Sequence, residues 1–478
     1  MNRRMICRVL GLILLCLAAL LLLPMVAGLC YGESVSHFLI TIAISGTVGF
    51  LLTRVRPYST VIYAKDGFVV VSLGWILMSM LGALPFVLSG DIPNYINALF
   101  ETVSGFTTTG ASILDDIEGL SRGCMFWRSF THWIGGMGVL VFILAVLPMS
   151  GEHSMHIMRA EVPGPTVGKL VPRVRQTAKI LYLIYIVMTV LEMLLLLLGG
   201  MDFYDALLHA FATAGTGGFS TRAASIAAFD SVYLEMVIAV FMVLFGINFN
   251  LYFLLLIGRW RDALKSEELR WYLSIIAASV LAIALGISKM YGGIAAGLRH
   301  AFFYVASITS STGFGTVDFV TWPEYCKWII VMLMFCGACA GSTGGGIKTS
   351  RVIILFKNVA CEIRQMIHPR TVTRVQLDGK RVDTAGLKAV STFFTSFMLL
   401  LIIGSFLVSL DGYDMATNFS AVLSSLSNIG PGMSLIGPTG NYNIFSYGSK
   451  LVLTLTMLIG RLEIFPILIL FSPSTWKR

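Results

Sequence analysis

Long apolar stretches separated by short polar segments recur along the whole chain. Runs of about 20 apolar residues are long enough to cross a bilayer as a helix. They predict spans near residues 6–31, 37–54, 68–90, 125–148, 178–199, 232–257, 271–290, 326–357, 387–409 and 447–471. The first stretch is longer than the apolar core of a signal peptide, so we interpret it as a retained helix. The pattern predicts an all-α polytopic membrane protein.

A shorter segment that ends in a glycine turn follows the first span of each later pair. The segment from Tyr95 to Thr108 is amphipathic and, at about 14 residues, too short to cross a membrane. The turns align on Gly110, Gly218, Gly313 and Gly430, and two positions earlier stand Thr108, Thr216, Ser311 and Asn428. Because self-similarity at a regular spacing indicates repeated units, we predict four pseudo-fourfold helix–re-entrant pore helix–helix repeats. Two extra N-terminal transmembrane helices precede them.

These repeats divide the chain into consecutive parts. An N-terminal pair of helices takes residues 1–56, and the pore repeats take 57–152, 153–258, 259–358 and 387–478. Residues 359–386, which mix charges with Pro369 and Gly379, are expected to form a cytoplasmic linker.

Composition and charge support a membrane protein and indicate its orientation. The chain is 56% hydrophobic and 12% charged, whereas about a quarter of the residues of an ordinary soluble domain are charged. The net charge of +9 is concentrated in basic segments at 54–65, 159–179, 259–270 and 348–388. Positively charged loops face the cytoplasm, so we expect these segments and both termini to be cytoplasmic. Topology explains the charge better than binding to nucleic acid does.

The four glycine turns together predict an ion pore. Irregular backbone at membrane depth is tolerated only where protein buries it or where it lines a wet cavity. Glycine permits the positive φ that lets successive carbonyl groups point the same way, and rings of carbonyl oxygens can replace the hydration shell of a cation. One such turn would carry little weight, because glycine and threonine also pack between membrane helices. Four aligned copies are a specific signal.

The four turns and their flanking helices resemble the Trk/Ktr/HKT superfamily of cation transporters. The two extra N-terminal spans make the chain most similar to the bacterial TrkH/TrkG-type membrane subunits. The resemblance implies a K⁺ selectivity filter at Thr108, Thr109, Gly110, Thr216, Gly217, Gly218, Ser311, Thr312, Gly313, Asn428, Ile429 and Gly430. All of these except Gly110, Gly218, Gly313 and Gly430 are the implied K⁺ ligands. A glycine in all four turns favours K⁺, since serine at the first turn accompanies Na⁺ permeation in some relatives.

The resemblance also implies location, partners and cargo. It implies a multi-pass protein of the bacterial inner membrane, surrounded by lipid, that forms homodimers. It implies a separate TrkA-like cytoplasmic regulatory subunit that binds nucleotides. K⁺ is then the transported ion, and no organic cofactor is expected in this chain.

Two features below the turns are candidate gate elements. Residues 337–348 are dense in glycine, which breaks a helix, and the resemblance implies an intramembrane gating loop at Gly341, Ser342, Thr343, Gly344, Gly345 and Gly346. Arg461 lies inside the last span, and an intramembrane charge marks a functional site or an ion pair. The resemblance places this arginine in the pore below the filter.

Three alternatives remain open on the residues alone. The first is a Na⁺-permeable member of the superfamily, or one that couples K⁺ to H⁺ or Na⁺ by symport. The second is a membrane enzyme that binds phosphate with Gly341–Gly346, although Ile347 stands where a phosphate loop has lysine. No catalytic constellation supports an enzyme. The third is a metal site at His153 and His156, for which a solvated loop is the better interpretation because further ligands are missing.

Overall fold

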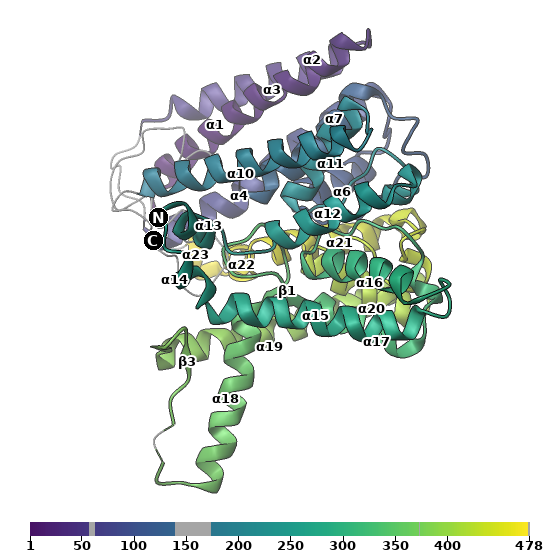
Figure 1. Ribbon diagram of the computed structural model, residues 1–478. Helices are drawn as coiled ribbons and strands as arrows, with labels where there is room; N and C mark the ends of the chain where they lie inside the picture. The colour runs from purple at the N-terminus through teal and green to yellow at the C-terminus, as the bar shows by residue number, and fades with distance from the viewer. Residues whose placement is uncertain (57–62, 139–173, 372, 477–478) are drawn as a thin grey trace.

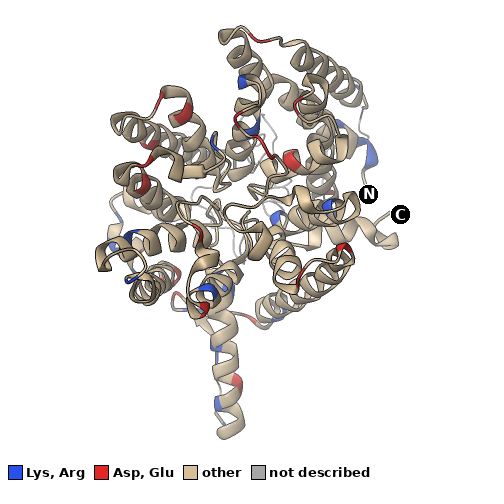
Figure 2. Ribbon diagram, turned by 90° about the vertical axis from the view of Figure 1, so that its right-hand side faces the viewer, with Lys and Arg blue, Asp and Glu red and all other residues tan. Residues whose placement is uncertain are grey.

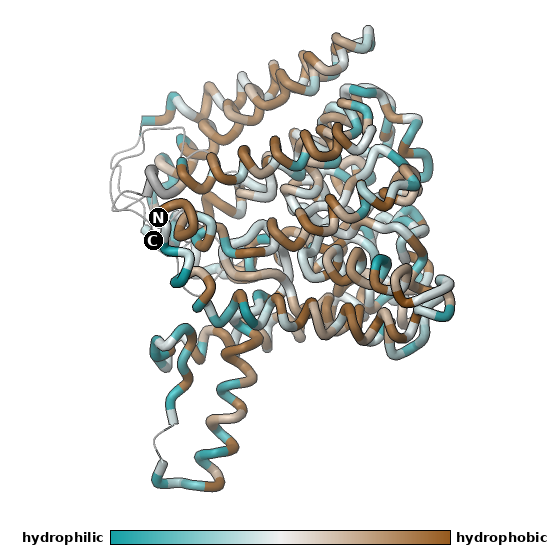
Figure 3. The backbone as a smooth tube through the Cα atoms, in the orientation of Figure 1, coloured by the Kyte–Doolittle hydropathy of each residue, from teal (hydrophilic) through white to brown (hydrophobic). Residues whose placement is uncertain are grey.

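The computed structural model describes residues 1–56, 63–138, 174–371 and 373–476. Most helices lie side by side in one bundle, and helix α18 (Thr349–Ile367) projects from it (Figure 1). Apolar residues follow the helices along the bundle, and hydrophilic residues gather at its ends (Figure 3). Within the described residues, six helices are long and apolar enough to cross a membrane, or seven if one bent pair is a single span.

The N-terminal pair of helices packs through glycine. Helices α1 (Arg3–Leu20) and α2 (Leu22–Cys30) form the first candidate span, and α3 (Ser36–Thr53) forms the second. A Cβ atom built on Gly11 of α1 would lie 2.7 Å from the carbonyl oxygen of Gly49 in α3. Small residues let membrane helices approach this closely, and the two spans expected at 6–31 and 37–54 are confirmed.

Each repeat begins with a long helix and continues with a short pore helix. The long helices are α4 (Ala64–Gly82) with its continuation α5 (Leu84–Ser89), α10 (Val174–Leu198), α15 (Glu267–Ile287) and α19 (Thr384–Val408). The pore helices are α6 (Tyr95–Phe106), α11 (Phe203–Gly215), α16 (Ile294–Thr309) and α20 (Met415–Ser427). With 12 to 16 residues, all four are shorter than a membrane span.

Side-chain caps fix where three of the pore helices begin. Asn94, Asp202 and Asp414 accept hydrogen bonds from backbone N–H groups of the first turn, which are otherwise unsatisfied at a helix N-terminus. Thr417 also donates to the carboxylate of Asp414, and this hydrogen bond lowers the pKa of Asp414 and favours the charged form of the cap.

The pore helices and the second helices of the repeats alternate in a ring. The second helices begin as α7 (Arg122–Gly136), α12 (Val232–Phe245), α17 (Glu324–Phe335) and α21 (Tyr447–Arg461). Pore helix α6 packs between α7 and α21, α11 between α7 and α12, α16 between α12 and α17, and α20 between α17 and α21. Each pore helix therefore lies between its own second helix and that of the preceding repeat. In Figure 2 the helices surround a central region of irregular backbone.

The second helices are broken, which corrects the continuous spans expected at 232–257 and 447–471 and confirms the interruption expected within 326–357. Helix α12 meets α13 (Phe249–Leu256) at a bend of 91°. Irregular backbone separates α17 from α18, and Glu463 and Ile464 have positive φ between α21 and α22 (Phe465–Phe471). Hydropathy sums apolarity over a window and does not detect such breaks. The remainder of the span expected at 125–148 lies outside the described residues.

The segment expected as a linker at 359–386 is partly helical. Helix α18 continues to Ile367, and a short hairpin follows, in which β3 (Gln376–Leu377) pairs antiparallel with β4 (Lys380–Arg381). The remaining elements are α14 (Trp260–Leu264), α23 (Pro473–Trp476), β1 (Cys336–Gly337), β2 (Ile347–Lys348) and the 3-10 turns Ser225–Phe229, Phe319–Thr321, Ser409–Asp411, Ser434–Ile436 and Tyr442–Ile444.

Candidate functional site

All four pore helices end in the same backbone motif. The residue two before each aligned glycine adopts the left-handed conformation, with φ of 56° at Thr108, 56° at Thr216, 61° at Ser311 and 54° at Asn428. The next residue donates its N–H to a carbonyl five residues earlier: Thr109 to Ser104, Gly217 to Ala212 and Thr312 to Ser307 at 2.8 Å, and Ile429 to Ser424 at 3.0 Å. This is the Schellman ending of a helix. It directs all four chains out of their helices with one geometry.

The four turns contact one another in cyclic order. A Cβ atom on Gly110 would lie 2.0 Å from the carbonyl oxygen of Gly217, one on Gly218 2.0 Å from that of Thr312, and one on Gly313 2.0 Å from that of Ile429. A Cβ atom on Gly430 would lie 2.7 Å from the carbonyl oxygen of Thr109, which closes the ring. The glycines are required here because their φ is positive, from 75° to 101°, and because the neighbouring turn occupies the space of a side chain.

A cavity opens on one side of this ring. Its lining includes all four aligned glycines together with Asp115, Arg128 and Arg222. The Asp115 carboxylate accepts hydrogen bonds from the side chains of Asn441 and Asn443 at 2.7 Å each. This cavity is therefore lined by backbone groups and by charged side chains of both signs.

The glycine-rich loop lies directly against the other side of the ring. The parallel pairing of β1 with β2 closes the loop at its base. A Cβ atom on Gly344 would lie 2.7 Å from the carbonyl oxygen of Ser310, and one on Gly345 2.4 Å from that of Ser427. The N–H of Gly345 donates to Ser311 Oγ at 2.6 Å. The loop thus packs under the third and fourth turns, and glycine is needed for this close approach.

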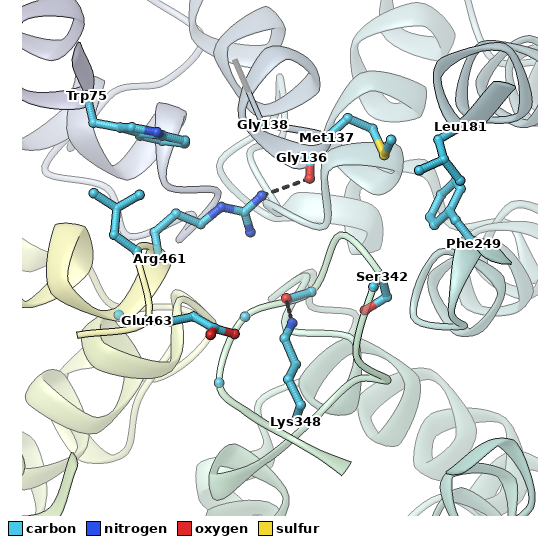
Figure 4. A pocket seen from close by; sticks show the side chains of 16 residues that line it. Trp75, Gly136, Met137, Gly138, Leu181, Phe249, Ser342, Lys348, Arg461 and Glu463 are labelled. Carbon is cyan, nitrogen blue, oxygen red and sulfur yellow. Dashed lines mark hydrogen bonds between the residues drawn. The ribbon is translucent and has the colours of Figure 1, made fainter. Parts of the chain in front are cut away.

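Arg461 joins this loop to the first repeat. Its guanidinium donates to the carbonyl oxygen of Thr343 at 2.8 Å and to those of Gly135 and Gly136 at 2.5 and 2.8 Å. The carbonyls of Gly135 and Gly136 lie at the C-terminal, partially negative end of α7, where a cation is favourable. Figure 4 shows Arg461 pointing into the cavity that the loop also lines.

Further charged residues surround the loop. Lys348 is buried and donates to the carbonyl oxygen of Gly344 (Figure 4). Arg351 pairs with Glu463 at 2.6 Å. The carboxylate of Glu268 accepts from the backbone N–H groups of Ala340 at 2.7 Å and of Ser350 at 3.0 Å. A glutamate at the start of an apolar span was the only signal available for Glu268.

The break between α12 and α13 also pairs with the loop. Cys339 donates its N–H to the carbonyl oxygen of Gly246, and Phe249 donates its N–H to that of Gly341, both at 3.0 Å. Backbone groups freed by the break are therefore satisfied by the loop, as buried backbone groups must be. The second and third repeats are joined through their irregular segments.

The loop has no free phosphate cradle. Gly344 and Gly345 pack against the ends of the pore helices, the Gly345 N–H donates to Ser311 Oγ, and the Lys348 ammonium donates to the carbonyl oxygen of Gly344. His153 and His156 lie outside the described residues.

Known proteins with similar sequences and structures agree with this geometry. The family model described as TrkH, cation transport protein, matches residues 33–478. The Trk system potassium uptake protein TrkH of Escherichia coli K12 is 35% identical over 489 residues and covers 100% of both chains. TrkG of the same organism is 33% identical over 465 residues, with coverage of 95% of this chain and 94% of its own. The crystal structure of the potassium transporter TrkH from Vibrio parahaemolyticus matches with a TM-score of 0.90 and 32% identity over 100% of both chains.

The fold and the ring of turns define a polytopic helical membrane protein of the transporter class rather than an enzyme. The chain belongs to the TrkH family of cation transport proteins.

Proposed function

We propose that the chain mediates K⁺ uptake through one selectivity filter to which each repeat contributes a quarter. The cyclic contact of four identical helix-ending turns carries this proposal. Such a ring supplies backbone carbonyls from four sides, the arrangement that replaces the hydration shell of a dehydrated cation. The names of the E. coli and Vibrio relatives, which describe potassium uptake and potassium transport, support K⁺ as the cargo.

In this proposal the K⁺ ligands are the residues that precede the four glycines. They are Thr108, Thr109, Thr216, Gly217, Ser311, Thr312, Asn428 and Ile429. Each pore helix points its C-terminal end toward the ring, and the partial negative charge there favours a cation. The four glycines are present for their backbone geometry.

The loop of residues 341–346 and Arg461 form the gate of the proposed pathway. The loop lies against the underside of the ring, and the positive charge of Arg461 lies beside it. A cation in the pore repels K⁺, and a packed loop obstructs it. Opening then requires the loop to leave the turns and Arg461 to release the carbonyl oxygen of Thr343.

The proposed orientation places both termini in the cytoplasm of a bacterium, with the protein in the inner membrane. The N-terminus and helix α23 lie at the same end of the bundle (Figure 1), as does α14, which Arg259 and Lys265 flank in the sequence. The positive-inside rule assigns that end to the cytoplasm. A TrkA-like regulatory subunit would bind there.

A homodimer completes the proposed assembly. Helix α18 projects from the bundle and exposes Phe356, Val359, Ile363 and Met366. A second copy of the chain would cover this apolar face, because an exposed apolar patch of this kind marks an interaction site.

Growth and flux measurements test the proposal. Expression in a bacterium that lacks its own K⁺ uptake systems should restore growth at low K⁺, and purified protein in liposomes should carry ⁸⁶Rb⁺ inward. K⁺ should compete with this flux far better than Na⁺. Equal competition by both ions would favour the Na⁺-permeable alternative, and a flux that requires a proton or sodium gradient would favour symport. Absence of both growth and flux at normal protein abundance would contradict the proposal.

A further inference from the structure

One register position of the pore helices contacts the segment that leaves the turn in three of the four repeats. Nine residues before the aligned glycines stand Glu101, His209, Tyr304 and Ala421. His209 contacts Ser220 Oγ at 2.9 Å, and Tyr304 accepts from the N–H groups of Thr316 at 3.2 Å and Val317 at 3.3 Å. Three of the four repeats thus tie the outgoing strand to the pore helix with different side chains. In the first repeat the tie is a charged group.

Glu101 is buried at this position and uses both carboxylate oxygens. Oε1 accepts from Ser112 Oγ at 2.9 Å, and Oε2 accepts from the N–H of Ile113 at 3.0 Å. These two residues directly follow Ala111 in the strand that leaves the first turn. The carboxylate therefore fixes the segment that leaves the first turn to pore helix α6.

Arg128 extends this tie to the second repeat. Its Nε lies 2.7 Å from Glu101 Oε1, and the exposed fractions of the two side chains are 2% and 0%. Its Nη1 donates to the carbonyl oxygen of Ser220 at 3.1 Å, and its guanidinium carbon lies 3.5 Å from the centre of the Phe219 ring. Phe219 and Ser220 follow the aligned Gly218. Arg128, through its pair with Glu101, thus joins the segments that follow the first and second turns.

The pair has a geometric advantage that a packed apolar pair would lack. A buried ion pair is weak evidence for stability, because desolvation of the two charges offsets their attraction. The planar guanidinium, however, donates along fixed directions and stacks on an aromatic face. Here these directions fix the distance between two turns whose backbones touch at Gly110 and Gly217.

We propose that the Arg128–Glu101 ion pair is a positioning element that sets the spacing of the first two turns, and with it the discrimination between K⁺ and Na⁺. This inference rests on the proposed function. Selectivity of a carbonyl ring depends on cavity size or on the field of the carbonyl dipoles, and both depend on how firmly the turns are held. Without the pair, the first two turns can close around the smaller ion.

The test removes both charges together. The double variant Glu101→Gln/Arg128→Met leaves no unpaired buried charge, and its thermal unfolding in detergent reports whether it is folded. The matched control is Glu235→Gln/Arg299→Gln, which removes an ion pair of 3.3 Å between α12 and the first turns of pore helix α16, away from the ring. The readout is inhibition of ⁸⁶Rb⁺ uptake into liposomes by K⁺ and by Na⁺ at equal protein density.

We expect the double variant to retain flux while its discrimination falls about tenfold, a loss of about 1.4 kcal/mol. The control should keep the discrimination of the parent. Arg128→Lys, which keeps the charge but loses the planar fork, should show an intermediate value and serves as the readout if the double variant does not fold. Parental discrimination in the double variant, or in Arg128→Lys in that case, would overturn the inference. A parent protein that does not prefer K⁺ would instead overturn the proposed function.

Discussion

The side-chain amide of Asn428 donates a hydrogen bond to Thr109 Oγ1 at 2.9 Å, although 319 residues separate the two. The same amide donates to the carbonyl oxygen of Met457 in α21 at 3.0 Å. One side chain therefore connects the fourth turn to the first and to the second helix of its own repeat. This contact completes the ring that the chain begins at Gly110.

Replacement of Asn428 by glycine isolates these side-chain bonds. Glycine adopts the left-handed conformation of this position without steric cost, so the loss relative to a matched glycine control reflects the two hydrogen bonds at about 1 kcal/mol each. We expect a lower thermal unfolding temperature and about tenfold weaker discrimination of K⁺ from Na⁺ in competition assays. Thr216→Gly is the control, because among the described residues the Thr216 hydroxyl donates only to the carbonyl oxygen of Gly215, within its own turn. An equal effect of both changes would contradict the role of the Asn428 contacts.

Replacement of Gly110 by serine should relax selectivity toward Na⁺. The new Cβ atom would meet the carbonyl oxygen of Gly217 at 2.0 Å, and the residue would retain a φ of 75° that disfavours side chains. The first and second turns must then separate, so we expect K⁺ flux to fall and discrimination to drop by about tenfold or more.

Gly90→Ser is the matched control for this change. Gly90 also has a positive φ, of 86°, but no atom of the described residues lies within 4 Å of a Cβ atom built on it. The Gly90→Ser variant therefore reports the effect of placing a side chain on a residue with positive φ, without a clash in the ring. If Gly110→Ser kept the selectivity of Gly90→Ser, the filter assignment would be wrong.

Replacement of Arg461 by alanine should raise cation flux. The change removes a positive charge from the cavity and the bonds to Thr343, Gly135 and Gly136 that hold the loop. Charged hydrogen bonds contribute about 1.5–3 kcal/mol, so we expect a severalfold or greater increase in ⁸⁶Rb⁺ flux per protein in liposomes. Lys450→Ala is the control. Lys450 is a buried cation of the same helix, but it donates to the side chains of Asn97 and Asn443, so its removal should not increase flux. Unchanged flux in Arg461→Ala would count against the gate.

Replacement of Glu268 by glutamine should also increase flux in the resting protein. The carboxylate joins Ala340, which precedes the loop, to Ser350 in the first turn of α18, which follows it. A neutral amide accepts more weakly than a carboxylate. The adjacent Glu267→Gln is the control, because Glu267 pairs with Lys357 at 2.5 Å and lies outside the loop. The measurement is ⁸⁶Rb⁺ flux into liposomes without a regulatory subunit, compared between Glu268→Gln and Glu267→Gln. Equal flux in both variants would show that Glu268 does not restrain the loop.

The repeat, the pore helices and the chemistry of the turns could be predicted because each is a local property. Glycine is needed at Gly110, Gly218, Gly313 and Gly430 because the backbone there has positive φ. The short amphipathic segment before each turn can be recognised from the sequence pattern. Arg461 was detectable for a similar reason, since a charge within an apolar span needs an explanation.

The partners of these residues were decided only by the tertiary structure. Glu101 meets Arg128, and Glu268 meets Ala340 and Ser350, across 27 to 82 positions of sequence. The close packing of the second helices is another tertiary property: at Gly460 of α21 a Cβ atom would lie 2.1 Å from the carbonyl oxygen of Leu426 in α20. The sequence by itself determined four turns of one geometry. The contacts that join the turns into one ring, and that pack the glycine-rich loop against it, connect distant segments and were decided only by the tertiary structure.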